Sequence, residues 1–352
     1  MRLYLAQQSA LEVMRHLRSV GDGTLEGRRT RVKTLKDAIG TMAQLSELDS
    51  TADRILSHVE GALHVYVPTR EAASRTRRII PHVWGGNVPY GAFVDIGHNI
   101  CVSSPEFLFA QMSLQLEKVE LIMLGMELCG SYSKWRLPPA SAEESRLALQ
   151  AEGRGVTFEL RPATTTRRLK DFIGRNEGMR GVTRTRGALR YVLDSSASPM
   201  ETATCLLLNL PRHLGGYGLP APVLNPQVTV STSQGKEVRY PDLYWREASL
   251  DVEYQSDQEH SGEWSRYRDS KRMVILTASH VTVLPLTRAQ LMSEADFDEF
   301  AHAVRKLLGV RRRQDDDEWR WRRHALRETT LGPHHEAVHE RVARLPNNRG
   351  FQ

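Results

Sequence analysis

The chain has 352 residues, 40% of them hydrophobic and 26% charged, which is typical of a globular protein with room for two or three domains. Its 48 Lys and Arg residues outnumber its 42 Asp and Glu residues, and the formal charge of +6 is compatible with a polyanionic partner without requiring one. The composition excludes a disordered chain and a disulfide-rich scaffold, and no stretch approaches the ~20 apolar residues that cross a bilayer. We expect a cytoplasmic protein without membrane contact, because Cys101, Cys129 and Cys205 sit in separate apolar contexts and the first residues lack the apolar run of a signal peptide.

Residues 1–62 are expected to form a helical N-terminal region. On both sides of a break at Gly21-Asp22-Gly23, apolar residues recur at helical spacing, namely Leu11, Met14, Leu17, Leu35, Ile39 and Met42. The basic segment from Arg28 to Lys33 is open to two interpretations, a contact for phosphates or the solvated start of a helix. The helix start is the more common use of such a segment, and we expect it here.

Residues 63–130 are expected to form a small α/β domain. The elements, in chain order, are strands over residues 63–67, 77–84 and 92–96 and helices over residues 105–112 and 119–129. The first helix has a capping serine, Ser104, and Pro105 in its first turn. His82 and His98 lack partners at metal-ligand spacing, so we expect structural roles for both.

This succession of strands, with Arg-Ile-Ile-Pro-His, Ser-Ser-Pro-Glu and an apolar helix, resembles the middle domain of bacterial abortive-infection type regulators. In that family the domain follows a winged helix-turn-helix. The N-terminus of this chain shows no clear recognition helix, so the resemblance does not imply that this region reads DNA.

Residues 131–195 are expected to form a basic connector with helical pieces. Its second half carries nine cations against few acids, namely Arg161, Arg167, Arg168, Lys170, Arg175, Arg180, Arg184, Arg186 and Arg190. Two interpretations remain open, a flank that follows a nucleic-acid backbone and a solvated helical surface.

Residues 196–312 carry the pattern with the clearest chemical meaning. Ser198 and Pro199 begin a helix that bears Glu201, and the helix is followed by strands expected over residues 227–231, 238–244 and 248–255. A closing strand over 281–284 and an amphipathic helix reaching Leu308 complete the region, and residues 313–352 form a charged C-terminal tail.

Asp242 ends one of these strands, and Glu253 and Gln255 lie on one face of the next. Carboxylates that end adjacent strands supply the hard oxygen ligands that a divalent metal needs to hydrolyse a phosphodiester. The competing interpretation is a solvent-facing polar edge. The arrangement as a whole, with the Glu201 helix in front and a basic helix behind, favours a site.

These residues resemble the PD-(D/E)XK nuclease superfamily, in particular its very-short-patch-repair-like branch. The resemblance rests on Ser-Pro-Met-Glu, Gly-Leu-Pro-Ala-Pro, Pro-Asp-Leu-Tyr-Trp and Val-Glu-Tyr-Gln-Ser-Asp-Gln-Glu-His. It implies an α/β (α+β) restriction-endonuclease-like fold, a mixed sheet flanked by helices, preceded here by the smaller helical and α/β regions. By position, Asp242 and Glu253 would ligate Mg²⁺ or Mn²⁺, and Glu201 would assist.

The sequence departs from the family pattern at Gln255, where a lysine or an aspartate is usual. An amide orients water but neither carries charge nor abstracts a proton. Lys271 is a candidate for the missing charge, and His260 is a candidate general acid or base; a surface lysine and a free loop histidine are the alternatives.

The segment after the carboxylates suits contact with a nucleic-acid backbone. We expect DNA contacts from three arginines on it, namely Arg266, Arg268 and Arg272. The sequence thus predicts a bacterial, metal-dependent DNA endonuclease acting in phage defence or DNA repair. A nuclease fold without turnover, acting as a DNA-binding regulator or antitoxin-like protein, is the alternative, and a protein-interaction module is the third. A homodimer is compatible with each.

Overall fold

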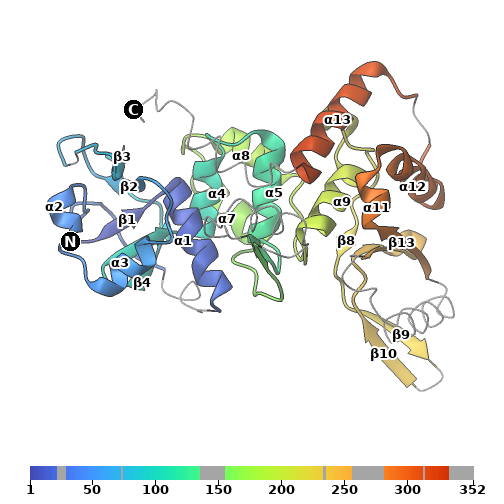
Figure 1. Cartoon of the computed structure of the whole chain (residues 1–352), viewed down its shortest axis with the longest axis horizontal. Coiled ribbons are helices and arrows are strands. Elements are labelled where there is room, and N and C mark those ends of the chain that lie inside the picture. The colour runs from blue at the N-terminus through green and yellow to red at the C-terminus, as the bar shows by residue number, and fades with distance from the viewer. Residues whose placement is uncertain are drawn as a thin grey trace, which may run out of the picture.

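The computed structural model describes residues 1–21, 29–72, 74–134, 155–232, 235–255, 281–311 and 314–332. The fold is α/β with mixed sheets, as expected from the sequence. Figure 1 shows one sheet at each end of the long axis, with a layer of helices between them. None of the helices that the structure describes combines the length and apolar character needed to cross a membrane.

The N-terminal sheet has five strands in the order β3-β2-β1-β5-β4. Its members are β1 (Leu3–Leu5), β2 (Leu63–Val67), β3 (Ile79–Val83), β4 (Phe93–Gly97) and β5 (Ile100–Ser103). Strand β1 is central, antiparallel to β2 and parallel to β5. The expectation of a separate helical region over residues 1–62 is therefore wrong, because three fully buried residues are too short a strand to show alternation in the sequence.

Three helices follow β1 along the chain: α1 (Gln7–Ser19), α2 (Met42–Leu45) and α3 (Ser50–Leu56). Helix α1 agrees with the predicted spacing, but the helix expected over Leu35 to Met42 does not form before Met42. Leu35 and Ile39 are buried because this stretch crosses the end of the sheet, where the Ile39 amide donates to the Arg2 carbonyl at 2.8 Å. The basic segment before it is not the start of a helix either.

The middle layer contains α4 (Pro105–Met112), α5 (Lys118–Leu128), α7 (Thr166–Arg175) and α8 (Val182–Leu189). The predicted cap of α4 is confirmed, since the Ser104 hydroxyl accepts the Phe107 amide at 3.4 Å. Helices α7 and α8 pack on α4 and α5, and Leu169 and Ile173 belong to the main hydrophobic core. Residues 155–195 are thus part of this layer instead of a connector.

The C-terminal sheet has the order β13-β12-β11-β8. Its members are β8 (Val223–Leu224), β11 (Leu243–Trp245), β12 (Leu250–Gln255) and β13 (Thr282–Thr287), while β9 (Val228–Thr232) pairs separately with β10 (Gly235–Arg239). The single strand expected over 238–244 is therefore two strands. They separate at Pro241, which has no N–H for a ladder hydrogen bond.

The helices of this half are α9 (Pro199–Asn209), α11 (Arg288–Met292), α12 (Glu294–Leu307) and α13 (Asp317–Leu331), with short 3₁₀ turns η2 (Arg212–Leu214) and η3 (Arg246–Ala248). Helix α13, expected in a charged tail, packs against η2, α9 and α5. Its Trp319 is buried and donates from Nε1 to the Gly216 carbonyl at 3.0 Å. Position 216 also requires glycine, because a Cβ there would lie 2.0 Å from the Leu210 carbonyl oxygen.

Candidate active site on the C-terminal sheet

Strand β12 carries two acidic residues into the interior of the sheet. It lies between β11 and β13, and both of its faces are covered. Leu250 and Val252 join the hydrophobic core, while Asp251 is 0% exposed and Glu253 is 9% exposed. The interpretation of a solvent-facing polar edge is therefore excluded. Burying an ionised carboxylate is costly unless a cation, hydrogen bonds or a proton offsets the loss of water.

Asp242 lies beside Glu253. It precedes β11, and the pairing of Leu243 with Val252 places Asp242 opposite Glu253. The Asp242 carboxylate accepts the Tyr254 amide at 2.8 Å, so it rests against the peptide that follows Glu253. Residues directly opposite in an antiparallel pair share a face. The register thus brings these two carboxylates to the same face.

Glu201 reaches this end of the sheet through Asn225. The Ser198 hydroxyl caps α9 by accepting the Glu201 amide at 3.0 Å, as predicted. The Glu201 carboxylate accepts the Asn225 side-chain amide at 2.7 Å and the Ala197 amide at 2.9 Å. The Asn225 backbone N–H donates to the Asp242 carbonyl at 3.2 Å. One residue therefore connects Glu201 to the main chain at Asp242.

Sequence reasoning did not identify Asn225. It follows the two-residue strand β8, precedes Pro226 and has a φ of +46°, a left-handed conformation that asparagine tolerates better than most residues. The Leu-Asn-Pro triplet is a local turn signal. It says nothing about the contact with Glu201, which is 24 residues away in the chain.

The electrostatic environment of Glu201 is unusual for a buried carboxylate. Burial raises its pKa, and hydrogen bonds from Ala197, Asn225 and Ser198 lower it by less, so the net shift is upward. No Lys or Arg in the described part of the chain forms an ion pair with this carboxylate. A proton, or a cation supplied from outside the protein, would offset the burial.

One more predicted site residue, Gln255, completes the described part of the site, and the others lie beyond it. Gln255 ends β12, two residues after Glu253 on the same face and opposite Thr287 of β13. His260, Lys271 and the arginines at 266, 268 and 272 fall in residues 256–280, outside the described residues.

The described residues contain no group of three or more His, Cys, Asp or Glu side chains placed to hold a metal ion. Mg²⁺, however, commonly takes one or two carboxylates from the protein and completes its shell with water and substrate phosphates. Asp242 and Glu253 supply hard oxygen donors from neighbouring strands on one face. The pair fits that mode of binding.

A basic helix begins close to this site. The Asp194 carboxylate caps α7 by accepting the Thr166 amide at 2.8 Å and its hydroxyl at 2.6 Å. The next carbonyl, that of Ser195, accepts the Asn225 side chain at 3.0 Å. Arg167 and Arg168 in the first turns of α7 are exposed, and neither forms an ion pair within the described residues. Exposed arginines of the basic stretch therefore lie on a helix whose start is joined to Asn225 through residues 194 and 195.

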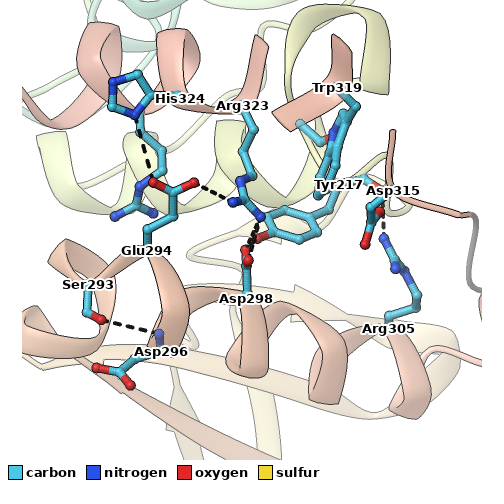
Figure 2. A network of polar contacts seen from close by, with 12 residues as sticks. Tyr217, Ser293, Glu294, Asp296, Asp298, Arg305, Asp315, Trp319, Arg323 and His324 are labelled. Carbon is cyan, nitrogen blue, oxygen red and sulfur yellow. Dashed lines mark hydrogen bonds and ion pairs between the residues drawn. The ribbon is translucent and has the colours of Figure 1, made fainter. Parts of the chain in front are cut away.

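A second polar cluster joins α12 to α13 and is structural. Figure 2 shows Arg323 of α13 between Glu294 and Asp298 of α12, with Tyr217 donating its hydroxyl to Asp298. The Arg323 guanidinium also lies over the Trp319 ring, 4.9 Å from its centre. These charges compensate one another and hold α13 against α12. The cluster therefore offers no acid, base or nucleophile for chemistry.

Comparison with protein-family models, with curated proteins and with solved structures finds no match to this chain.

Proposed function

We propose that the protein is a metal-dependent DNA endonuclease whose site is formed by Asp242 and Glu253. The observation that carries the proposal is the placement of these carboxylates, opposite each other on one face of the sheet, with Glu253 buried. Mg²⁺ or Mn²⁺ held by such a pair would polarise a phosphodiester and generate a hydroxide from bound water at neutral pH.

The residues around the pair have separate roles in this proposal. The Tyr254 amide fixes one oxygen of Asp242 and so orients the other. Glu201 and Asn225 are positioning residues, because they hold the main chain at Asp242. Gln255 orients water or a phosphate oxygen through its amide but takes no proton. The exposed arginines of α7 contact the phosphate backbone, together with the predicted contacts at Arg266, Arg268 and Arg272.

The alternative function is DNA binding without cleavage, as in a regulator or an antitoxin-like partner. Gln255 favours this alternative, because an amide stands where the nucleases that this sequence resembles usually carry a charged side chain. This function predicts salt-sensitive DNA binding without a metal-dependent product. In both cases we place the protein in the cytoplasm, where its three buried free thiols would stay reduced.

The test is cleavage of plasmid, linear duplex and single-stranded DNA by the full chain with Mg²⁺ or Mn²⁺, beside the Asp242→Asn variant. Asparagine keeps an acceptor for the Tyr254 amide but loses the charge, so we expect a loss of cleavage of roughly 10²-fold or more. The matched control is Glu247→Gln, an exposed acid on η3 between the same two strands, which should cleave normally.

Calorimetric titration with Mn²⁺ gives a readout independent of turnover. Asp242→Asn and Glu253→Gln should each weaken Mn²⁺ binding, while Glu247→Gln should not. Equal cleavage by Asp242→Asn and the natural chain would contradict the proposal. Absence of any cleavage, with salt-sensitive DNA binding retained, would favour the alternative function.

A further inference from the structure

A pocket of about 750 Å³ is lined by residues of β1 and β4 and by the segment from Arg29 to Asp37. Figure 1 shows these two strands at the opposite end of the long axis from β13. The pocket lining combines five cations with two acids and several neutral residues. The charged residues are Arg2, Arg29, Arg31, Lys33, Lys36, Asp37 and Asp95. Neither the carboxylate site nor the polar cluster at α13 includes any of them.

One part of the pocket lining is fixed by ion pairs and a hydrogen bond among its own residues. Arg2 lies 3.8 Å from the Asp37 carboxylate and 3.3 Å from that of Asp95. The Tyr4 hydroxyl donates to Asp37 at 2.9 Å, and burial and this hydrogen bond raise the tyrosine's pKa. One arginine thus faces two carboxylates, so this part of the pocket carries a net charge of −1 and is not the part that attracts an anion.

The segment from Arg29 to Lys36, which we call the rim, carries cations that form no ion pair with the described residues. Arg31, Lys33 and Lys36 are exposed, and none of them forms an ion pair or a side-chain hydrogen bond with any residue that the structure describes. Arg29 is different, because it pairs with the buried Glu106 carboxylate at 2.7 Å. Three cations therefore surround the opening without an internal partner.

The rim segment is pinned in place by backbone hydrogen bonds. The Thr30 amide donates to the Phe93 carbonyl at 2.9 Å, and the Lys33 carbonyl accepts the Val88 amide at 3.0 Å. Between these points Val32 packs against the aromatic cluster beneath, while Arg31 and Lys33 on either side of it stay exposed. Arg31 and Lys33 are thus two residues apart on the pinned segment, and Lys36 lies in the turn that follows it.

We propose that this pocket binds phosphate groups of a nucleic-acid strand. Three unpaired cations, on a short segment that backbone hydrogen bonds hold in place, match a ligand that carries several negative charges along one chain. Guanidinium binds phosphate through two parallel hydrogen bonds, and Thr30 and Thr34 add hydroxyl donors. The site shares with the proposed nuclease only the class of ligand, because its two carboxylates, Asp37 and Asp95, face Arg2 and its binding of DNA does not require cleavage.

The test is fluorescence anisotropy of short labelled single-stranded and duplex DNA with the full chain, in EDTA so that no strand is cut. We expect the Arg31→Glu/Lys33→Glu variant to bind about ten-fold more weakly, with a salt dependence whose slope falls by about 1.4 to 1.8. Arg31→Lys/Lys33→Arg keeps the charges and should bind as the natural chain does. The matched control is Lys306→Glu/Arg311→Glu, which makes the same change of charge at exposed positions of the other half.

Each result decides the question. Unchanged binding by Arg31→Glu/Lys33→Glu, or an equal loss in the Lys306→Glu/Arg311→Glu control, would overturn the proposal. So would binding of a nucleoside diphosphate that depends on Arg31 and Lys33 while no oligonucleotide binds, since the ligand would then be a small phosphate compound. The two proposals fail separately: Asp242→Asn should lose cleavage and keep pocket-dependent DNA binding. Circular dichroism and the melting temperature confirm that each variant is folded.

Discussion

The two halves of the molecule bury carboxylates in different ways. In the N-terminal half, Glu127 is 2.6 Å from Arg15, and Glu106 is 2.7 Å from Arg29 and accepts the Thr164 hydroxyl at 2.6 Å. Burial is the largest single influence and raises the pKa of each acid, but the facing arginine and the neighbouring groups together lower it by more, so both pKa values lie below the usual range. These carboxylates are charged and compensated, as in a structural ion pair.

Glu201 in the C-terminal half is equally enclosed but faces only neutral donors. Burial therefore dominates, and its pKa lies above the usual range. Burial alone therefore does not indicate function, because the two halves share it. A buried carboxylate that the protein leaves without a cation is the better candidate for a functional residue.

We expect the largest loss of stability from neutralising a buried carboxylate that an arginine compensates. Glu127→Gln would leave Arg15 facing a neutral amide in an interior position, and Arg18, which donates to the Glu127 carbonyl at 3.3 Å, would lose a nearby negative charge. Removing one partner of a buried ion pair costs about 3–5 kcal/mol, and we expect a loss of that size in the free energy of urea unfolding.

The control for this variant is Glu177→Gln. Glu177 forms an exposed ion pair with Arg186, and its side chain is 68% exposed. Exposed pairs contribute about 0–1 kcal/mol, so this substitution should change stability little. Equal effects at the two positions would show that Glu127 is not a structural ion-pair partner, and the contrast with Glu201 would then have no basis.

A second, smaller effect is expected from a pair of histidines in the N-terminal half. The His64 and His82 rings meet at 3.0 Å between Nδ1 and Nε2. Burial lowers the pKa of His64 to about 4, with Glu12 opposing and Arg75 reinforcing the shift. Burial, His64 and Arg75 lower the pKa of His82 to about 3. Both rings are therefore neutral in the folded protein at pH values where the unfolded chain binds protons.

The sign of the resulting pH dependence is fixed by these shifts. The unfolded chain takes up protons as the pH falls through about 6.5 and the folded protein does not, so folding becomes less favourable in acid. Each ring accounts for about 2 kcal/mol between pH 6.5 and about pH 5. Urea unfolding at several pH values should show that His82→Gln loses about 2 kcal/mol less than the natural chain over this range. His302→Gln, at an exposed position of α12, should leave the pH dependence unchanged.

Local patterns predicted much of the fold. The strand over residues 63–67 and the serine caps of α4 and α9 depend on neighbours in the sequence, and all three are confirmed. The central position of β1 and the docking of α13 depend on partners far away in the chain. Leu5 pairs with Val65, and Trp319 bonds to Gly216 over a separation of 103 residues. No local periodicity reports such contacts.

The same distinction between local patterns and contacts distant in the chain applies to the candidate site. Alternation along β12 and the turn before it predicted that Glu253 and Asp242 share a face, and the register agrees. The depth of burial was not predictable, because an alternating strand reads the same whether its polar face is covered or open. The environment of Glu201 was not predictable either. It depends on a contact with Asn225 and on the lack of an arginine partner among the described residues.

The same substitution of Glu by Gln in the C-terminal half, at Glu201, should change the free energy of unfolding least. It tests whether the two halves bury their carboxylates in different ways. The contribution of a carboxyl with a raised pKa is present at low pH and is lost as the pH rises through the raised value. Glu201→Gln keeps an acceptor for the Ala197 and Asn225 amides and removes the charge that burial disfavours. At about pH 9 we therefore expect this variant to equal the natural chain or exceed it by about 1 kcal/mol in urea unfolding, the opposite sign to Glu127→Gln. If Glu201 also positions Asp242 through its charge, DNA cleavage should fall about ten-fold in a protein that is no less stable. A loss of stability like that of Glu127→Gln would instead mean that Glu201 is charged and compensated, and the two halves would then bury their carboxylates alike.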